Sequence, residues 1–311
     1  MGVSAIYGLP GRGKSLFSTY IGFHLAEKYQ KAIVSNFPFK PVALARYFQL
    51  MGYRWLSENL EKGIIFYADT RGKPEQLLNI FLVPDSIILW DEVGSDLPSR
   101  GAIYNTPKKL LECLYQVRHE AQYLFVIAQN ESQIDFALRN LVEEIFHCDG
   151  YRSYSPKLKN EQLDFKFVYR FDPDSYQVYL NDPKIRKNPL KCRVLANKCW
   201  QGWLSCMDGF SFYLYDSFTK LSQQSLASDK SWLFYDSIEG FPLKRIVGKN
   251  PYKIHELNKV STILMKWLPS PFLTKLLKLD KKLSRINPLE RRIFQFGLPI
   301  ILLMIIGAIL L

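Results

Sequence analysis

Cysteine is scarce in this sequence, and no pairing pattern relates the few that are present. The 311 residues include five cysteines. An odd number without paired spacing argues against a disulfide framework and favours a reducing compartment. Cys192, Cys199 and Cys206 are seven residues apart, which is not a zinc-site spacing, and neither His119 nor His147 has a second ligand at a helpful spacing. Disulfide-stapled and zinc-binding proteins are therefore not expected.

We expect neither a leader sequence nor an internal repeat. We expect no secretory signal peptide, because a glycine-rich loop already begins at residue 8. The triplet Tyr-Asp-Ser occurs at residues 215–217 and again at 235–237, but its flanks differ. We therefore predict no repeat architecture.

Positive charge is in excess and is unevenly distributed. The net charge is +12, and 48% of the residues are hydrophobic, which is ample for a core. Residues 1–150 carry 15 basic and 16 acidic side chains, whereas residues 151–311 carry 26 and 13. The excess lies entirely in the second half and indicates an anionic partner, either lipid or nucleic acid.

A glycine-rich motif near the start of the chain fits the pattern G-x-x-x-x-G-K-[ST] at every position. A short β-type run precedes it at residues 3–7, and apolar residues at helical spacing follow it over residues 16–25. This strand, loop and helix context predicts a phosphate-binding loop. The residues that we expect around the nucleotide are Gly8, Leu9, Pro10, Gly11, Arg12, Gly13, Lys14, Ser15 and Leu16.

Each part of this motif has a defined chemical role. Glycines let successive backbone N–H groups point at phosphate oxygens, and the positive end of the following helix adds to their field. Lys14 is expected to reach the β- and γ-phosphates, and the Ser15 hydroxyl to bind Mg²⁺. The predicted cofactors are therefore ATP and Mg²⁺.

A buried strand that ends in two carboxylates follows at residues 86–92 and is typical of a Walker B element. Asp91 is predicted to hold the magnesium ion through water or through Ser15, and Glu92 to orient the attacking water. Such a strand is common by chance. The complete phosphate loop upstream is what favours the catalytic interpretation.

Two further polar residues are candidates for the same site. The apolar run at residues 123–128 ends at Gln129, which we predict to sense the γ-phosphate, although a simple strand-end cap explains it equally well. A helix is predicted from residue 132 to Val142. Its Arg139 is a candidate arginine finger acting across subunits of a ring, or else a solvated or ion-paired helix residue.

Strands and helices alternate to about residue 150, which predicts an α/β fold with a mainly parallel sheet. The alternation over residues 163–171 predicts a half-buried strand, and residues 176–180 are expected to return as the second strand of a hairpin. Residues 181–200 are basic and irregular. With Trp200 and Trp203 they could bind single-stranded nucleic acid, or they form an ordinary basic surface loop.

The last 19 residues, 293–311, carry no formal charge. At about 1.5 Å per residue they span roughly the hydrocarbon thickness of a bilayer, and a basic segment precedes them. The positive-inside rule then predicts a single-pass membrane protein whose N-terminal part is cytoplasmic. We predict four parts: an ATPase core over 1–150, a β-rich basic extension over 151–260, a basic amphipathic juxtamembrane segment over 261–292 and a transmembrane helix over 293–311.

The ordered set of motifs resembles the zonula-occludens-toxin-like (Zot) family, the filamentous-phage assembly ATPases. The matching pieces are residues 8–15, residues 87–92, Arg118-His119, residues 128–135 and the triplet at 215–217. The resemblance implies a P-loop NTPase with a RecA-like core that contains an additional strand. It also implies an inner-membrane ATPase that helps to extrude single-stranded-DNA phage, and an extracytoplasmic domain is common in the family after the span.

The leading hypothesis is a membrane-anchored, oligomeric Mg²⁺-dependent ATPase that drives assembly and export of filamentous phage. Its expected partners are further copies of the chain, phage coat or other assembly proteins, and anionic lipids, with single-stranded DNA as a further candidate. The alternatives are a DNA translocase or packaging ATPase that handles single-stranded DNA directly, and a membrane scaffold that binds nucleotide without hydrolysis. A small-molecule kinase is disfavoured, because nothing indicates a second substrate pocket.

Overall fold

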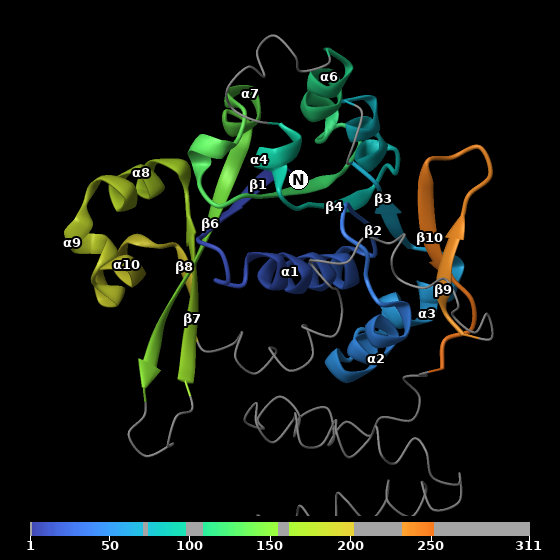
Figure 1. The fold of residues 1–311 in the computed structure, drawn as a ribbon, viewed down its shortest axis with the longest axis horizontal. Coiled ribbons are helices and arrows are strands. Elements are labelled where there is room, and N and C mark those ends of the chain that lie inside the picture. Colours follow the sequence, from blue (N-terminus) through green and yellow to red (C-terminus); the bar gives the residue numbers. More distant parts are fainter. Residues whose placement is uncertain (1, 71–73, 98–107, 155–161, 202–231, 252–311) are drawn as a thin grey trace, which may run out of the picture. The chain divides into compact units, whose positions relative to one another are not determined.

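A computed structural model describes residues 2–70, 74–97, 108–154, 162–201 and 232–251 (Figure 1). All of them belong to a unit that ends at Ile254, and the second unit, residues 255–311, lies outside the described part. The triplet at 215–217 lies outside it as well.

One sheet of ten strands organises the described residues, in the order β8-β7-β6-β1-β5-β4-β2-β3-β10-β9. The strands from β6 to β3 in this order pair in parallel, and the pairs at both edges are antiparallel. The predicted α/β fold with a mainly parallel sheet is therefore confirmed. The strands are β1 (Val3–Tyr7), β2 (Ala32–Ser35), β3 (Ile65–Ala68), β4 (Ser86–Trp90), β5 (Tyr123–Ile127), β6 (Val142–Tyr154), β7 (Gln162–Phe171), β8 (Lys198–Gln201), β9 (Phe234–Ser237) and β10 (Leu243–Val247).

Strand β5 lies between the strand that precedes the phosphate loop and the strand that carries the acid pair. Ile6 of β1 pairs with Ile127, and Trp90 of β4 pairs with Val126. Because parallel strands end at the same edge of a sheet, residues that follow β1, β5 and β4 meet there. The sequence separates these residues widely, and the strand order brings them together.

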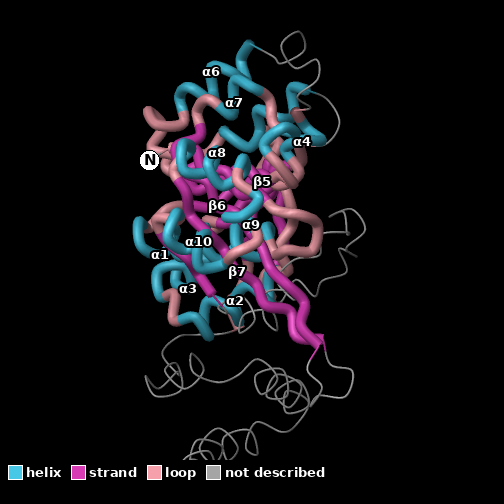
Figure 2. The backbone as a smooth tube through the Cα atoms, turned by 90° about the vertical axis from the view of Figure 1, so that its left-hand side faces the viewer, coloured by secondary structure: helices cyan, strands magenta, loops and turns pink. Residues whose placement is uncertain are grey.

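Helices cover both faces of the sheet (Figure 2). Helix α1 and the helices α2 and α3 pack on one face, and α4, α6, α7 and α8 pack on the other. The helices are α1 (Lys14–Tyr29), α2 (Pro41–Met51), α3 (Arg54–Asn59), α4 (Val93–Asp96), α6 (Lys108–Gln116), α7 (Phe136–Arg139), α8 (Pro173–Asn181), α9 (Pro183–Arg186) and α10 (Pro189–Leu195), with 3₁₀ turns η1 (Leu60–Lys62), η2 (Pro74–Phe81) and η3 (Glu131–Gln133).

Strand β4 shows how the two cores divide. Ile87 and Leu89 belong to the core beneath α1, whereas Ile88 and Trp90 belong to the opposite core. All four side chains are fully buried. A parallel strand that is covered on both faces reads as a continuous apolar run, which is why residues 86–90 show no polar alternation.

The second half of the chain contains more helix than the sequence pattern predicts. Residues 176–180 were expected to form a strand, but they lie in α8. Asp172 caps this helix by accepting a hydrogen bond from the Ser175 amide at 2.9 Å, and Pro173 occupies its first turn. Tyr176 and Tyr179, one helical turn apart, are buried together. Local capping therefore overrides the apparent alternation.

Two neighbouring expectations are also corrected. The helix predicted from residue 132 to Val142 is only the short α7, and Val142 already begins β6. The basic residues 181–200 are not irregular, since they contain α9, α10 and β8. Strands β6 and β8 form by pairing with distant parts of the sheet, which helical spacing does not register. Helices α9 and α10 form because Asp182 and Asn188 cap them locally.

Strands from beyond residue 150 complete both edges of the same sheet. Strands β7 and β8 extend it beside β6, and β10 with β9 extends it beside β3. Tyr235 of β9 is half-buried, and its hydroxyl accepts a hydrogen bond from the Phe39 amide at 2.8 Å. The domain boundaries at 150 and 260 stay predictions.

The structure contradicts the single-pass membrane location predicted from the sequence. Among the described residues, no helix combines the length and the apolar character that a membrane crossing needs. The longest, α1, has 16 residues, or about 24 Å, and includes Lys14, Glu27 and Lys28. Residues 293–311, on which the prediction was based, lie outside the described part.

Candidate nucleotide-binding site

The predicted phosphate loop connects β1 to α1 at the carboxyl edge of the sheet. Its first residue, Gly8, has φ +150° and donates its amide hydrogen to the Gln129 carbonyl at 3.1 Å. A Cβ atom here would lie 2.4 Å from the backbone oxygen of Cys148 in β6. Only glycine fits this position, because the loop enters between two neighbouring strands with no space for a side chain.

The second part of the loop leads directly into α1. Gly11 and Gly13 have φ values of +75° and +84°, and the Gly13 carbonyl accepts the Phe17 amide at 2.8 Å. Gly13 has no side chain to cap the helix, so capping does not compete for the first amides of α1. This arrangement suits a phosphate group, which the helix N-terminus and the loop amides can hold together.

Lys14 lies across the loop. Its Nζ atom donates a hydrogen bond to the Leu9 carbonyl at 3.2 Å. Burial lowers the pKa of Lys14, and the nearby Asp91, Cys148 and Glu92 partly oppose that shift. The ammonium group is therefore poorly solvated, and a phosphate bound in the loop would stabilise its charged form.

Ser15 and Asp91 meet at the end of β4, as the sequence predicts for two magnesium ligands. The Ser15 hydroxyl donates to Asp91 Oδ2 at 2.5 Å. Burial raises the pKa of Asp91, although the hydrogen bonds from Ser15 and from the Glu92 amide oppose the shift. Both side chains offer oxygen, the ligand type that Mg²⁺ prefers, and a cation would stabilise the partly buried carboxylate. The residues present therefore fit Mg²⁺.

Glu92 follows Asp91 in an unusual backbone conformation. Its φ is +55°, in the left-handed region, and its amide donates to Asp91 Oδ1 at 2.8 Å. The side chain is exposed at the start of α4. Glu92 is thus accessible to a water molecule at the nucleotide, and its role as the residue that orients water stays a prediction.

Gln129 lies at the end of β5, between the phosphate loop and the acid pair. Its carbonyl accepts the Gly8 amide, and its own amide donates to Gln133 Oε1 at 3.0 Å. The Gln129 side chain is exposed. The strand order thus places Gln129 where a γ-phosphate sensor is expected, and sensing itself stays a prediction.

Arg139 lies elsewhere. It belongs to α7, on the sheet face opposite α1, and lines a cavity of about 210 Å³ with Tyr7 and Glu131. Its guanidinium carbon is 5.8 Å from the centre of the Phe136 ring. The structure does not group Arg139 with Lys14 and Asp91, and a role across subunits stays a prediction.

One residue of the site was missed by the sequence interpretation. Asn36 directly follows β2, and its side chain makes two hydrogen bonds to the backbone of Asp91. The available signal was its position, because a polar residue after a buried parallel strand lies at the carboxyl edge of the sheet.

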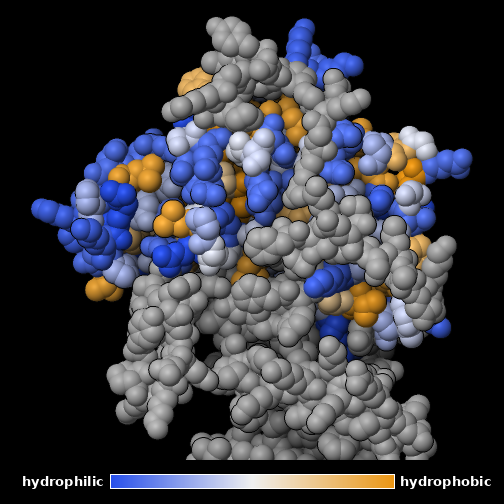
Figure 3. Space-filling model, in the orientation of Figure 1, coloured by the Kyte–Doolittle hydropathy of each residue, from blue (hydrophilic) through white to orange (hydrophobic). Residues whose placement is uncertain are grey.

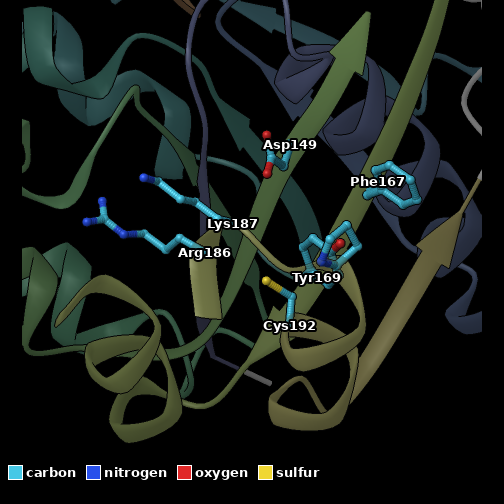
Figure 4. Close-up of a pocket in the computed structure, with 7 residues that line it drawn as sticks. Asp149, Phe167, Tyr169, Arg186, Lys187 and Cys192 are labelled. Carbon is cyan, nitrogen blue, oxygen red and sulfur yellow. The ribbon is translucent and has the colours of Figure 1, made fainter. Parts of the chain in front are cut away.

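A separate cavity of about 160 Å³ lies on the sheet face opposite α1 (Figure 4). Arg186 and Lys187 extend to one side of it, while Tyr169 and Cys192 lie together on the other. Asp149 also lines this cavity, so a carboxylate shares it with the cations. Its mixed charge does not suit a triphosphate.

The phosphate loop, the acid pair and the strand between them define a P-loop NTPase of the class with an additional central strand. No family model and no curated protein matches the sequence. Among solved structures, the chain is similar to the N-terminal domain of zonular occludens toxin from Neisseria meningitidis, with a TM-score of 0.35 and 18% identity over 69% of this chain and 98% of that one. The predicted resemblance is confirmed by this match.

The chain is also similar to two other solved structures. The flagellar accessory protein FlaH from Methanocaldococcus jannaschii gives a TM-score of 0.39 and 10% identity over 55% of this chain and 78% of that one. The genome packaging NTPase B204 from Sulfolobus turreted icosahedral virus 2, in complex with AMP, gives 0.36 and 12% over 56% and 93%. These TM-scores and sequence identities are low, and they carry no argument about function.

Proposed function

We propose that this chain is an Mg²⁺-dependent ATPase. The observation that carries the proposal is the 2.5 Å contact between the Ser15 hydroxyl and Asp91 Oδ2, which joins residues 76 positions apart beside Lys14. A polar contact of this kind at the carboxyl edge of a parallel sheet is the arrangement that a nucleotide and its metal ion require.

The residues divide the chemistry as follows. Loop amides and Lys14 bind and orient the phosphates, and Ser15 with Asp91 holds the metal ion. When bound, Mg²⁺ neutralises charge on the phosphate oxygens. Glu92 orients a water molecule and accepts its proton, and Gln129 contacts the terminal phosphate.

The process that hydrolysis drives is also part of the proposal. The ordered motifs resemble the Zot family, and that resemblance supports assembly and export of filamentous phage by an oligomer of this chain. Phage coat or other assembly proteins are then its partners. Anionic lipids, which the sequence also suggested, stay a prediction.

Replacing Lys14 tests both the ATPase activity and the role in phage export. Lys14→Ala is expected to reduce ATP hydrolysis by about 100-fold or more, because a donor to the transferred phosphoryl group is lost. Lys28→Ala, in the exposed last turn of the same helix, is the matched control and should keep wild-type turnover. Phage release from cells that carry Lys14→Ala should fall in parallel. Unchanged release with lost hydrolysis would contradict the export role alone.

Direct action on single-stranded DNA is the second candidate. Six basic residues lie between positions 183 and 200 without any acidic residue among them, and hydrophilic side chains gather over α8 to α10 in Figure 3. Binding that weakens steeply with added salt, and hydrolysis that single-stranded DNA stimulates, would favour this candidate over virion assembly. The six residues are Lys184, Arg186, Lys187, Lys191, Arg193 and Lys198.

A further inference from the structure

We propose that Asn36 is a positioning residue for the metal-binding and water-orienting turn that follows β4. The inference rests on the proposed ATPase function and adds a residue to it. Asn36 makes its hydrogen bonds to Asp91 with the backbone of that residue and not with its carboxylate. Its influence on catalysis is therefore indirect.

The geometry of this contact is a clamp with two points. Asn36 Oδ1 accepts the Asp91 amide hydrogen at 2.8 Å, and Asn36 Nδ2 donates to the Asp91 carbonyl at 2.8 Å. One side-chain amide therefore holds both peptide groups that flank a single residue. Asn36 is 7% exposed, so water has little access to replace either bond.

The clamp continues the pairing of two strands beyond their ends. Strand β2 pairs with β4 as far as Ser35 and Leu89, and the Asn36 amide still donates to the Leu89 carbonyl at 3.2 Å. From that point the Asn36 side chain replaces the backbone ladder. It thereby extends the rigid part of the sheet by one residue, to the peptide groups of Asp91.

A second anchor holds the other end of the turn. Asp96 Oδ2 accepts from Trp90 Nε1 at 2.7 Å and from the Thr70 hydroxyl at 2.8 Å. Asn36 Nδ2 also lies 3.2 Å from the Thr70 hydroxyl oxygen. The network thus links the ends of β2, β3 and β4 with the end of α4.

Between these anchors lies Glu92 with φ +55°. A left-handed conformation is unfavourable for a residue with a side chain, so the turn needs external support to keep it. In that conformation the Glu92 amide reaches Asp91 Oδ1, while Asp91 Oδ2 meets Ser15. Loss of the clamp would let the turn relax and would move the two carboxylates away from the places that catalysis requires.

The test compares two buried asparagines in the full-length chain. Asn250 is 5% exposed, and its Nδ2 donates to the Ser57 carbonyl at 3.3 Å, far from the acid pair in the sheet order. Asn250→Ala therefore removes a comparable buried amide. Thr70→Val is a second comparison, because it breaks the network but leaves both bonds from Asn36 to Asp91.

Asn36→Ala is expected to lower kcat for ATP by about 10- to 100-fold, the usual effect of removing a residue that orients a metal ligand. The affinity for nucleotide without Mg²⁺ should change less than about 3-fold. We expect Mg²⁺ to tighten nucleotide binding in a Glu92→Gln background. Adding Asn36→Ala to that background should reduce this gain in affinity by about 10-fold, measured with a fluorescent ATP analogue. Asn250→Ala should stay near wild type in kcat. Thr70→Val should lose less than Asn36→Ala, because the bond from Trp90 Nε1 to Asp96 remains.

The outcomes separate the two proposals. Absence of Mg²⁺-dependent hydrolysis in the wild type would overturn the ATPase function and the role of Asn36 with it. Wild-type kcat and metal dependence in Asn36→Ala, with hydrolysis abolished by Glu92→Gln, would overturn the role of Asn36 alone. An equal loss of kcat in Asn250→Ala would show that Asn36 is merely structural. If Asn36→Ala does not fold, Asn36→Asp, which keeps the acceptor and removes the donor, is judged by the same criteria.

Discussion

The nucleotide region and the lateral region are stabilised in different ways. We define the nucleotide region as residues 8–15 with Asn36, Asp91 and Glu92, and the lateral region as β6 to β8 with α8 to α10. The first depends on polar contacts and on left-handed backbone at Gly11, Gly13 and Glu92. The second depends on aromatic packing, in which His147 lies 4.9 Å from the Tyr179 ring, measured between ring centres.

This difference indicates where substitutions should alter chemistry and where they should alter stability. Within the described part of the lateral region, no residue other than glycine has a positive φ. Strain in the nucleotide region is typical of a functional site, whereas relaxed backbone with buried rings is typical of a structural one. The regions meet at Gly8, which touches Cys148 of β6.

The largest effect is expected inside the nucleotide region. Glu92→Gln should lower the rate of ATP hydrolysis by about 100- to 10,000-fold, because an amide cannot accept the proton of the attacking water. ATP affinity and the melting temperature should stay near wild type, since the Glu92 side chain is exposed. Single-turnover hydrolysis and equilibrium nucleotide binding measure the two quantities. Wild-type hydrolysis by this variant would remove Glu92 from the mechanism.

At the junction of the two regions, Gly8→Ala should lower stability and nucleotide affinity together. Its Cβ would lie 2.4 Å from the Cys148 oxygen, at φ +150°. We expect a loss of about 4 kcal/mol in the free energy of unfolding from strain and overpacking combined. Gly11→Ala is the matched control, because Gly11 also has a positive φ, +75°, but has nothing within 4 Å of its Cβ position.

That control should lose only about 1 kcal/mol. Urea unfolding measures both variants. Equal losses would show that the close approach to β6 does not contribute to the free energy of unfolding. The left-handed backbone conformation would then account for the whole loss.

The smallest effect is expected in the lateral region and depends on pH. Burial lowers the pKa of His147 from 6.5 to about 4, with Nδ1 3.2 Å from the Tyr176 hydroxyl oxygen. Between these values the unfolded chain binds a proton that the folded chain does not, so stability falls as the pH drops from 6.5 towards 4. The loss is on the order of 3 kcal/mol.

Replacement of His147 tests this linkage. His147→Gln should lack this part of the pH dependence in urea unfolding at a series of pH values, whereas the exposed control His119→Gln should keep it. ATP turnover at neutral pH should not change, since His147 lies outside the nucleotide region. A wild-type pH profile in His147→Gln would disprove the assignment.

The order of the motifs along the chain predicted the chemistry better than it predicted the boundaries of the elements. The motif at residues 8–15 and the apolar strand before Asp91 are local patterns. Composition and spacing were enough to predict each of them. The strand predicted at residues 163–171 is present as β7. The return strand at 176–180 was wrong, because a cap at Asp172 and a buried tyrosine pair decide that segment.

The sequence by itself determined the phosphate loop, the acid pair, the alternation of strands and helices, and the excess of positive charge beyond residue 150. These features depend on neighbours in the chain or on composition. The tertiary structure alone decided that Asn36 holds Asp91, that Gly8 must lack a side chain beside Cys148, and that Arg139 lies away from Lys14. Each of these depends on which strands become neighbours, and strand pairing between distant residues leaves no periodic trace in the sequence.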